Sequence, residues 1–436
     1  MSGRGFYVRA YVILLLLSLA VDVKLFSLAA LTIQTVPLCL FVLFAGAPLP
    51  LLYFEDFRRF AGERKRLLAI TALFLVSGVL SAFLSPFSVL YGLKWLAQYG
   101  IFMAMSFFLL FLFSLERGLG LFFLRILAVL AVLLAILSFF EAVDGDLYRF
   151  LSGAFRDGEM QVIDGRYRVG ATLTNPNIFG CFMSLGIFLL WFQKESFGMK
   201  TTFFYVAAAF LCAALALSGS RNGTLVLFLP LGFLLFNRKT AKTALVVLFC
   251  AALALVLLTP FLRFADLGEQ PLTGTVAAPA GLAYNKVTSR VMIWKSALAM
   301  FRDHPLFGIG PGGVNEALRD YAPADLLAMD SGKIEKGYLN AHNGFLNILA
   351  EFGAAGTALA LLFVFCLFMP LARRYGFFPF GPVQALLLGL VLSFGPDAFF
   401  YSRFYMVMTV TVFLIFAFPG EALGDPAAAQ AEDPET

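Results

Sequence analysis

Apolar stretches recur along the whole chain, each roughly 17–25 residues long and separated from the next by a polar segment. A helix rises about 1.5 Å per residue, so about 20 apolar residues cross the hydrocarbon core of a bilayer. The pattern predicts an all-α polytopic membrane protein with about 12 transmembrane helices. Their approximate ranges are 8–22, 25–45, 67–84, 93–113, 119–142, 175–193, 201–218, 222–237, 243–262, 342–369, 380–396 and 403–420.

The short loops between these stretches carry lysine and arginine on alternate sides. Under the positive-inside rule, the side with the excess of these residues is cytoplasmic. The cations that fall on this side are Arg4, Arg9, Arg58, Arg59, Arg64, Lys65, Arg66, Arg117, Lys194, Lys200, Arg238, Lys239, Lys242, Arg373 and Arg374. Both termini are therefore predicted to be cytoplasmic. The alternative is a signal peptide cleaved after Ser18-Leu19-Ala20, which would remove the first helix and move the mature N-terminus outside.

Two long loops are predicted on the opposite, extracytoplasmic side. One covers 143–174 and lies within the region of helices 1–9, which spans 1–262. The other covers 263–341 and precedes helices 10–12, which occupy 342–420. The acidic tail 421–436 is rich in Ala and Pro and reads as a disordered cytoplasmic end.

The large loop has its own pattern. Gly268 to Lys286 is rich in Pro, Gly, Ala and Thr and predicts a mobile segment. From Ser289 the spacing turns helical, and Pro305 and several glycines end that helix before a second one near 314–328. The apolar residues of the first helix predict a single face that lies on the membrane surface: Val291, Trp294, Leu298 and Phe301.

Composition agrees with lipid as the solvent. Hydrophobic residues make up 61% of the chain and charged residues 14%, and the mean hydropathy is +0.87. Soluble domains have about 25% charged residues, so a soluble fold is excluded. The net charge of +5 comes without a basic stripe interleaved with aromatics, which argues against nucleic-acid binding. The 5 cysteines lie in apolar runs without a CxxC pair, so neither a disulfide framework nor a metal site is predicted.

Some cations lie on the extracytoplasmic side, where the topology rule does not account for them. Arg221 occupies the turn Ser218-Gly219-Ser220-Arg221-Asn222-Gly223 between two apolar helices. A guanidinium group matches phosphate oxygens in a two-pronged arrangement, so Arg221 is a candidate diphosphate ligand. The alternative is an interfacial arginine that extends toward water. Arg290 and Arg302 on the surface helix have the same two interpretations, the simpler being attraction to anionic headgroups.

The loop 143–174 ends in a polar motif. Arg166 and Arg168 precede Asn175-Pro176-Asn177, which opens the sixth helix. Asn is favoured at the N-cap and Pro at the first helical position, so Asn175 is predicted to cap that helix. Arg168 and Asn177 are candidates for contact with a sugar or a phosphate.

His342 is one of only 2 histidines and begins the tenth predicted helix. An imidazole titrates near neutral pH and can act on a substrate reached from both water and lipid, although a lone histidine at a helix start is often only interfacial. Asn343, Asn347 and Glu351 follow at helical spacing and predict a polar stripe that faces a cavity or another helix. Glu351 is either a proton acceptor or, more commonly, a partner for a buried arginine.

Gly353 and Gly356 lie on roughly the same predicted face as His342. Small residues let two membrane helices approach closely, so these glycines predict another helix packed below the imidazole.

The pattern His342-Asn343, nine residues, Gly353-x-x-Gly356 resembles the signature of the bacterial O-antigen ligase superfamily. Three further segments resemble it in the same order, so the similarity spans about 165–360. They are Arg168 to Asn177, Ser218 to Arg221, and Ser289-Arg290 with Trp294 running into Asp303-His304-Pro305-Leu306-Phe307-Gly308-Ile309-Gly310-Pro311-Gly312.

The resemblance implies a GT-C-like glycosyltransferase in the bacterial inner membrane. Members of the superfamily transfer a glycan from undecaprenyl diphosphate to lipid A–core at the periplasmic face, without metal or nucleotide cofactor. It implies His342 as the catalytic residue, with Arg221 and Arg290 acting on the diphosphate. Direct displacement would invert the anomeric centre. The residues expected to contact substrate are Arg168, Asn175, Asn177, Arg302, Asn343, Asn347 and Glu351.

Other functions fit the same residues. An O-antigen or exopolysaccharide polymerase uses the same donor with a second lipid-linked glycan as acceptor, and a protein O-oligosaccharyltransferase glycosylates protein. A transporter of small anions belongs to a different class and should place its site near the bilayer midplane, in broken helices. The arginines and the histidine instead cluster at one rim of the membrane, which favours surface chemistry.

Overall fold

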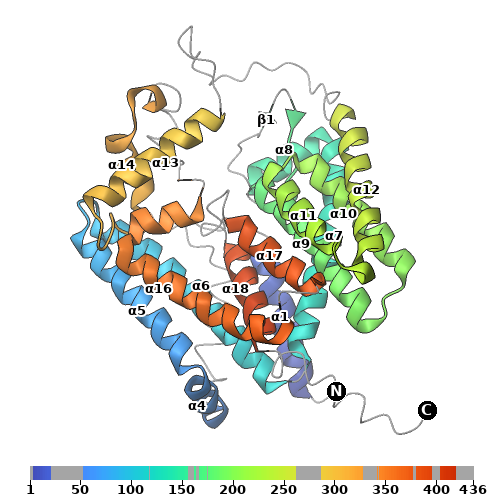
Figure 1. Cartoon of the computed structure of the whole chain (residues 1–436), viewed down its shortest axis with the longest axis horizontal. Helices are drawn as coiled ribbons and strands as arrows, with labels where there is room; N and C mark the ends of the chain where they lie inside the picture. The colour runs from blue at the N-terminus through green and yellow to red at the C-terminus, as the bar shows by residue number, and fades with distance from the viewer. Residues whose placement is uncertain are drawn as a thin grey trace.

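The computed structural model describes the greater part of the chain, and almost all of it is helical (Figure 1). The described residues are 3–20, 53–116, 118–155, 162–163, 166–173, 175–261, 286–327, 341, 343–376, 380–394 and 403–418. Within them, one pair of short antiparallel strands departs from the predicted all-α fold: β1 (Val162–Ile163) pairs with β2 (Arg166–Tyr167) in the loop 143–174.

Helices long and apolar enough to cross a membrane account for most of the predicted spans. There are 7 of these among the described residues, and the chain is a polytopic helical membrane protein. They lie in α5 (Lys65–Leu84), α6 (Val89–Leu115), α7 (Leu119–Val143), α9 (Pro176–Phe197), α10 (Thr201–Ser218), α12 (Arg238–Phe261) and α16 (Gly344–Tyr375).

Shorter apolar helices occupy the positions of other predicted spans. They lie in α1 (Gly3–Ala20), α11 (Arg221–Leu234), α17 (Pro382–Phe394) and α18 (Arg403–Ala417). The predicted span 25–45 lies outside the described residues, so the count of 12 stays a prediction. The remaining helices are α4 (Phe54–Glu63), α8 (Gly145–Phe155), α13 (Lys286–Asp303) and α14 (Gly313–Tyr321).

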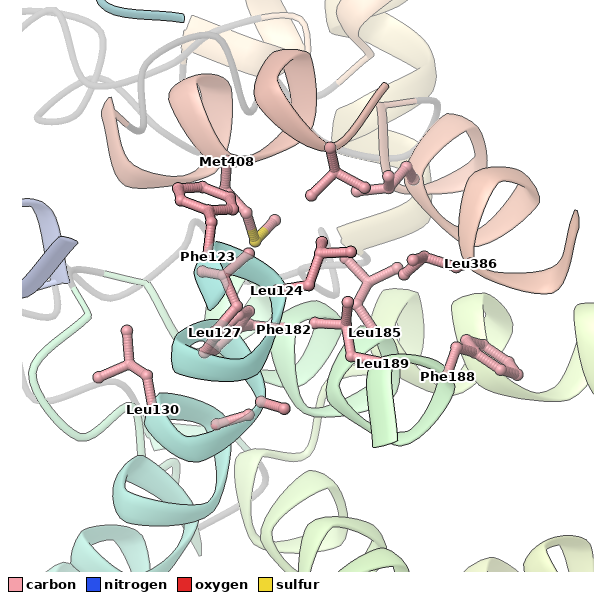
Figure 2. Close-up of a cluster of buried hydrophobic side chains, with 14 of the residues drawn as sticks. Phe123, Leu124, Leu127, Leu130, Phe182, Leu185, Phe188, Leu189, Leu386 and Met408 are labelled. Atoms are coloured by element: carbon pink, nitrogen blue, oxygen red, sulfur yellow. The ribbon is translucent and has the colours of Figure 1, made fainter. Parts of the chain in front are cut away.

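The largest apolar core extends through many of the helices, and Figure 2 shows the part of it where α7, α9, α17 and α18 meet. Phe123 of α7, Phe182 of α9 and Met408 of α18 all lie in this core. The spanning stretch of α9 is 94% buried, so this helix is enclosed by protein rather than lipid. Its neighbour α11 approaches closely because Gly223 has no side chain, and a Cβ there would lie 2.6 Å from the carbonyl carbon of Gly180.

The loops contact one another in two groups, one at each end of the helices, and these are the two groups that the charge pattern predicts. At one end, the guanidinium of Arg9 pairs with Glu116 at 2.8 Å, and that of Arg64 lies 4.1 Å from the ring centre of Phe418. At the opposite end, the Thr172 hydroxyl donates to the Ala20 carbonyl at 2.9 Å, and the Ser85 hydroxyl donates to the Ile309 carbonyl. We call this second end the site end. The compartment that each end faces stays a prediction.

The segment 286–327 forms a small structure of its own at the site end, with its own apolar cluster. Helix α13 turns Ile293, Ala297 and Met300 into an apolar cluster shared with α14 and the start of α16. Val291 and Leu298 are exposed instead. The buried face of α13 is therefore the one that α14 and α16 cover, and contact of the exposed face with the membrane stays a prediction. Helix α14 also ends at Tyr321, before the predicted boundary.

Figure 1 shows two groups of helices on either side of the view. Helices α5, α13, α14 and α16 lie on one side, and α7, α9, α10, α11 and α12 lie on the other. Helices α1, α17 and α18 are drawn between them. Each group carries part of the predicted site.

Candidate active site

Arg168 connects two segments that the sequence separates by 50 positions. Its side chain is buried, with 7% exposed. Its Nε donates to the Ser218 carbonyl at 2.7 Å, and a terminal nitrogen donates to Asn177 Oδ1 at 2.7 Å. The structure thus brings the motif before α9 and the turn before α11 into one cluster. We call Glu141, Arg168, Asn177, Ser218 and Arg221 the arginine cluster.

Asn175 and Ser220 cap the two helices that meet at this cluster. Asn175 Oδ1 accepts from the Asn177 backbone N–H at 2.8 Å, and Pro176 follows at the first position of α9, so the predicted cap is confirmed. Ser220 Oγ accepts from the Gly223 N–H at 3.0 Å and caps α11. The side-chain oxygen of Asn175 is therefore engaged in holding the helix start.

Arg221 is the first residue of α11, and its side chain is exposed at the site end. The next residue, Asn222, is only 8% exposed. Among the described residues, neither the oxygen nor the nitrogen of its amide has a hydrogen-bond partner. A buried amide without partners is costly, so Asn222 is a candidate for contact with a polar ligand that sequence reasoning missed. Its position directly after Arg221 was the available signal.

Glu141 was also missed by sequence reasoning. It lies near the end of α7 with 2% of its surface exposed. Its carboxylate accepts from the backbone N–H groups of Gly170 and Ala171, the shortest bond being 2.8 Å. A single acidic residue at the end of an apolar stretch was the signal for it, since a charge there requires a partner.

A backbone contact holds the large loop against α16. Residues 305–310 run alongside the first part of that helix, and we call them the docked segment. Two N–H groups of the segment donate to helix carbonyls, from Ile309 to Ala350 at 2.9 Å and from Gly310 to Glu351 at 3.0 Å. Two helix N–H groups donate in return, those of Ala354 and Ala355 at 2.8 and 3.0 Å.

Gly353 makes this contact possible. Its φ of 61° and ψ of −162° interrupt α16, which frees the backbone groups that the docked segment uses. A Cβ on Gly353 would lie 2.5 Å from the Leu306 backbone, and one on Gly308 would lie 2.5 Å from Glu351. The predicted continuous helix is therefore wrong at this point. The prediction of a close approach was correct for Gly353, but its partner is a loop rather than a helix, and Gly356 faces Phe352 of its own helix.

The chain on both sides of His342 is fixed, while His342 itself lies outside the described residues. The Trp294 indole N–H donates to the Ala341 carbonyl at 2.8 Å. The Ala341 N–H donates to Asn347 Oδ1 at 3.3 Å. Asn343 caps α16, and its Oδ1 accepts from the N–H groups of Phe345 and Leu346 at 3.0 and 3.1 Å. Two residues of the predicted polar stripe, Asn343 and Asn347, thus hold the backbone on either side of His342.

Arg290 precedes Trp294 by one helical turn, so both side chains leave the same face of α13. Because Trp294 contacts Ala341, this face of α13 is turned toward the segment that contains His342. Arg302 lies about 18 Å farther along the helix axis and is exposed. The structure therefore brings Arg290, but not Arg302, toward Ala341.

Glu351 is buried two turns below Asn343. Its side chain forms a hydrogen bond with the hydroxyl of Tyr99 on α6. Tyr99 is thus one partner of Glu351, and the arginine partner stays a prediction. Its backbone carbonyl also accepts from the Ser81 hydroxyl at 2.7 Å, so this part of α16 is tied to α5.

Within the described residues, no group of His, Cys, Asp and Glu could hold a metal ion. The side chains gathered at the site end are guanidinium, amide and indole groups with two buried carboxylates. The guanidinium, amide and indole N–H groups donate hydrogen bonds and can therefore bind anions and hydroxyls.

Fold and site together define a multi-pass membrane protein with cationic and polar groups collected at one end of its helices. Residues 204–361 match the family model described as O-antigen ligase. The predicted resemblance is confirmed. The match contains Arg221, Arg290 and His342, while Glu141, Arg168 and Asn177 precede it. The match supports a glycosyltransferase-type role in O-antigen processing. No curated protein matches the chain.

Proposed function

We propose that this protein transfers a glycan from undecaprenyl diphosphate to lipid A–core at the periplasmic face of the bacterial inner membrane. The observation that carries the proposal is the hydrogen bond from Trp294 to Ala341. It joins the helix that bears Arg290 to the residue before His342, and all of these residues lie inside the region that matches the O-antigen ligase model.

The proposed reaction is a direct displacement without metal or other cofactor. An acceptor sugar hydroxyl attacks the anomeric carbon, the bond from that carbon to the diphosphate oxygen breaks, and undecaprenyl diphosphate leaves. The anomeric configuration inverts. His342 takes or orients the proton of the attacking hydroxyl, since imidazole is partly unprotonated at neutral pH. Arg221 and Arg290 offset the negative charge that develops on the diphosphate.

The other polar residues have assigned parts in the proposal. Arg168, Asn177 and Asn222 lie beside Arg221 and would face the donor. Asn343 and Asn347 position the stretch that contains His342. A transporter is disfavoured by this arrangement because the polar groups gather at the site end, and the break in α16 is occupied by the docked segment rather than left open to a substrate.

A transfer assay with purified protein in nanodiscs tests the proposal. The substrates are an undecaprenyl-diphosphate glycan and rough lipopolysaccharide, and the variants are His342→Ala and Arg290→Ala. Wild type is expected to produce glycan-bearing lipopolysaccharide, and each variant is expected to lose at least about 100-fold in turnover, as for other groups that stabilise developing charge. Lys295→Ala is the matched control, because Lys295 is an exposed cation on the same helix.

Full activity in both variants would contradict the proposed site. Longer lipid-linked glycans without modified lipopolysaccharide would identify a polymerase that uses the same residues. Glycosylated protein as the only product would identify an oligosaccharyltransferase.

A further inference from the structure

Glu141 is a buried carboxylate at the end of a strongly apolar helix, and the proposed reaction gives it no role. It receives the N–H groups of Gly170 and Ala171, with distances of 3.2 and 2.8 Å to Oε2. A carboxylate accepts such bonds more strongly than a neutral group does, because the bonds are charge-assisted. The two residues belong to the loop that carries Arg168.

The backbone that Glu141 holds has an unusual conformation. Ala171 has a φ of 48°, in the left-handed region that residues with a Cβ rarely adopt. The Leu173 N–H closes a turn onto the Gly170 carbonyl at 3.0 Å, and the Thr172 hydroxyl binds the end of α1. Contacts from other elements thus shape the loop, and Glu141 supplies a charged contact among them.

A chain of hydrogen bonds leads from this loop to Arg221. Arg168, two residues before Gly170, donates to the Ser218 carbonyl and to Asn177. The Ser218 hydroxyl accepts from the Ser220 N–H at 3.2 Å, and Ser220 caps the helix that begins with Arg221. A shift of the loop would therefore move both arginines of the cluster.

We propose that Glu141 is a positioning residue that holds Arg168, and through it Arg221, in place for the diphosphate of the lipid-linked donor. The inference rests on the proposed function for the identity of the ligand. If the proposal is correct, loss of the carboxylate raises the KM for the donor and leaves the KM for the acceptor unchanged.

The first test is steady-state transfer by Glu141→Gln, with donor and acceptor varied separately. We expect the donor KM to rise at least tenfold while the acceptor KM stays within twofold of wild type. Glu141→Asp should fall between the two proteins, because the charge is kept but the reach is shortened. Glu116→Gln is the matched control, since Glu116 binds Arg9 at the opposite end of the molecule. Equal donor KM in wild type and Glu141→Gln would overturn the proposal.

A double-mutant cycle keeps the proposal testable if Glu141→Gln folds poorly. If Glu141 acts through Arg168, then Glu141→Asp should raise the donor KM in wild type and have no further effect in an Arg168→Ala background. Full additivity of the two changes would overturn the proposal.

A binding measurement separates this inference from the proposed function. The thermal shift produced by undecaprenyl diphosphate should be smaller for Glu141→Gln than for wild type. If wild type transfers no glycan but its diphosphate-induced shift is reduced in the variant, the proposed function fails and the positioning role stands. If wild type transfers glycan and the shift is the same in both, the positioning role fails and the proposed function stands.

Discussion

The two parts of the candidate site are held together by different means. The arginine cluster depends on side chains that bind backbone groups, as Arg168 does at Ser218 and Glu141 at Ala171. The docked segment depends on backbone groups that bind one another across the break at Gly353. Charged side chains stabilise the arginine cluster, whereas the docked segment can form its backbone contacts because Gly353 and Gly308 have no side chain.

This difference decides how each part should respond to substitution. A charged residue can be replaced by a neutral residue of similar shape, so the arginine cluster can lose function while its helices stay folded. No comparable replacement exists in the docked segment, because a Cβ at Gly353 or Gly308 would clash with backbone atoms of the segment packed against it. We therefore expect the docked part to be the more sensitive to small changes.

The largest effect is expected for Gly353→Ala. A φ of 61° with a ψ of −162° is a conformation that is open almost only to glycine, and holding alanine in it costs of the order of 1–3 kcal/mol before the clash with Leu306 is counted. We expect loss of the docked segment, a lower melting temperature and no transfer. Thermal unfolding and the transfer assay measure both. Gly232→Ala is the control, because a Cβ there meets nothing within 4 Å. Equal stability of the two variants would show that the break in α16 is not required.

A smaller effect is expected for Trp294→Phe. This change keeps an aromatic ring and removes the indole N–H that binds the Ala341 carbonyl at 2.8 Å. A single hydrogen bond contributes about 0.5–1.5 kcal/mol, so stability should fall only slightly. Transfer should fall about 5- to 30-fold, because the residue before His342 is no longer held; misplacement of a reacting group by about 1 Å can cost about 100-fold. Unchanged turnover would mean that this bond does not position the site.

The smallest effect is expected for Glu316→Gln on α14, close to the docked segment. Burial raises the pKa of the Glu316 carboxyl, against a smaller opposite effect of the Ser88 N–H. The Glu316 carboxyl therefore binds its proton more tightly in the folded protein than in the unfolded chain. The ordinary pKa is about 4.3, so the free energy of unfolding falls as the pH rises from there through the raised pKa of the folded protein. In the glutamine variant, stability should not fall with pH through this group. Its melting temperature at neutral pH should exceed that of wild type by no more than about 2 °C. Melting curves of both proteins from pH 4 to 8 test this, and parallel curves would contradict it.

Much of the architecture could be predicted from the sequence. Apolar length predicted the spanning helices, because lipid leaves a backbone no other partners than its own carbonyls. The cap at Asn175 was also predictable, since a cap involves only residues two or three positions apart. The grouping of loops at the two ends agrees with the contacts of Arg9, Thr172 and Ser85.

The buried face of α13 could not be predicted in this way. Val291 and Leu298 are as apolar as the residues that are buried, and periodicity alone cannot tell which stripe meets protein. The position of α14 and α16 makes that choice. The same limit applied to Gly356, whose spacing resembles that of a packing motif although its neighbour is Phe352.

The sequence by itself determined the class of the protein, its membrane-spanning helices and the superfamily of residues 204–361, because hydrophobic length, caps and motifs are local properties. Only the tertiary structure decided that Glu141 serves the loop of Arg168, 27 positions away, and that Gly353 opens α16 for residues 305–310. Such partners depend on how the helices pack in three dimensions. The sequence shows that a buried charge or a glycine needs a partner, but it does not show which residue that partner is.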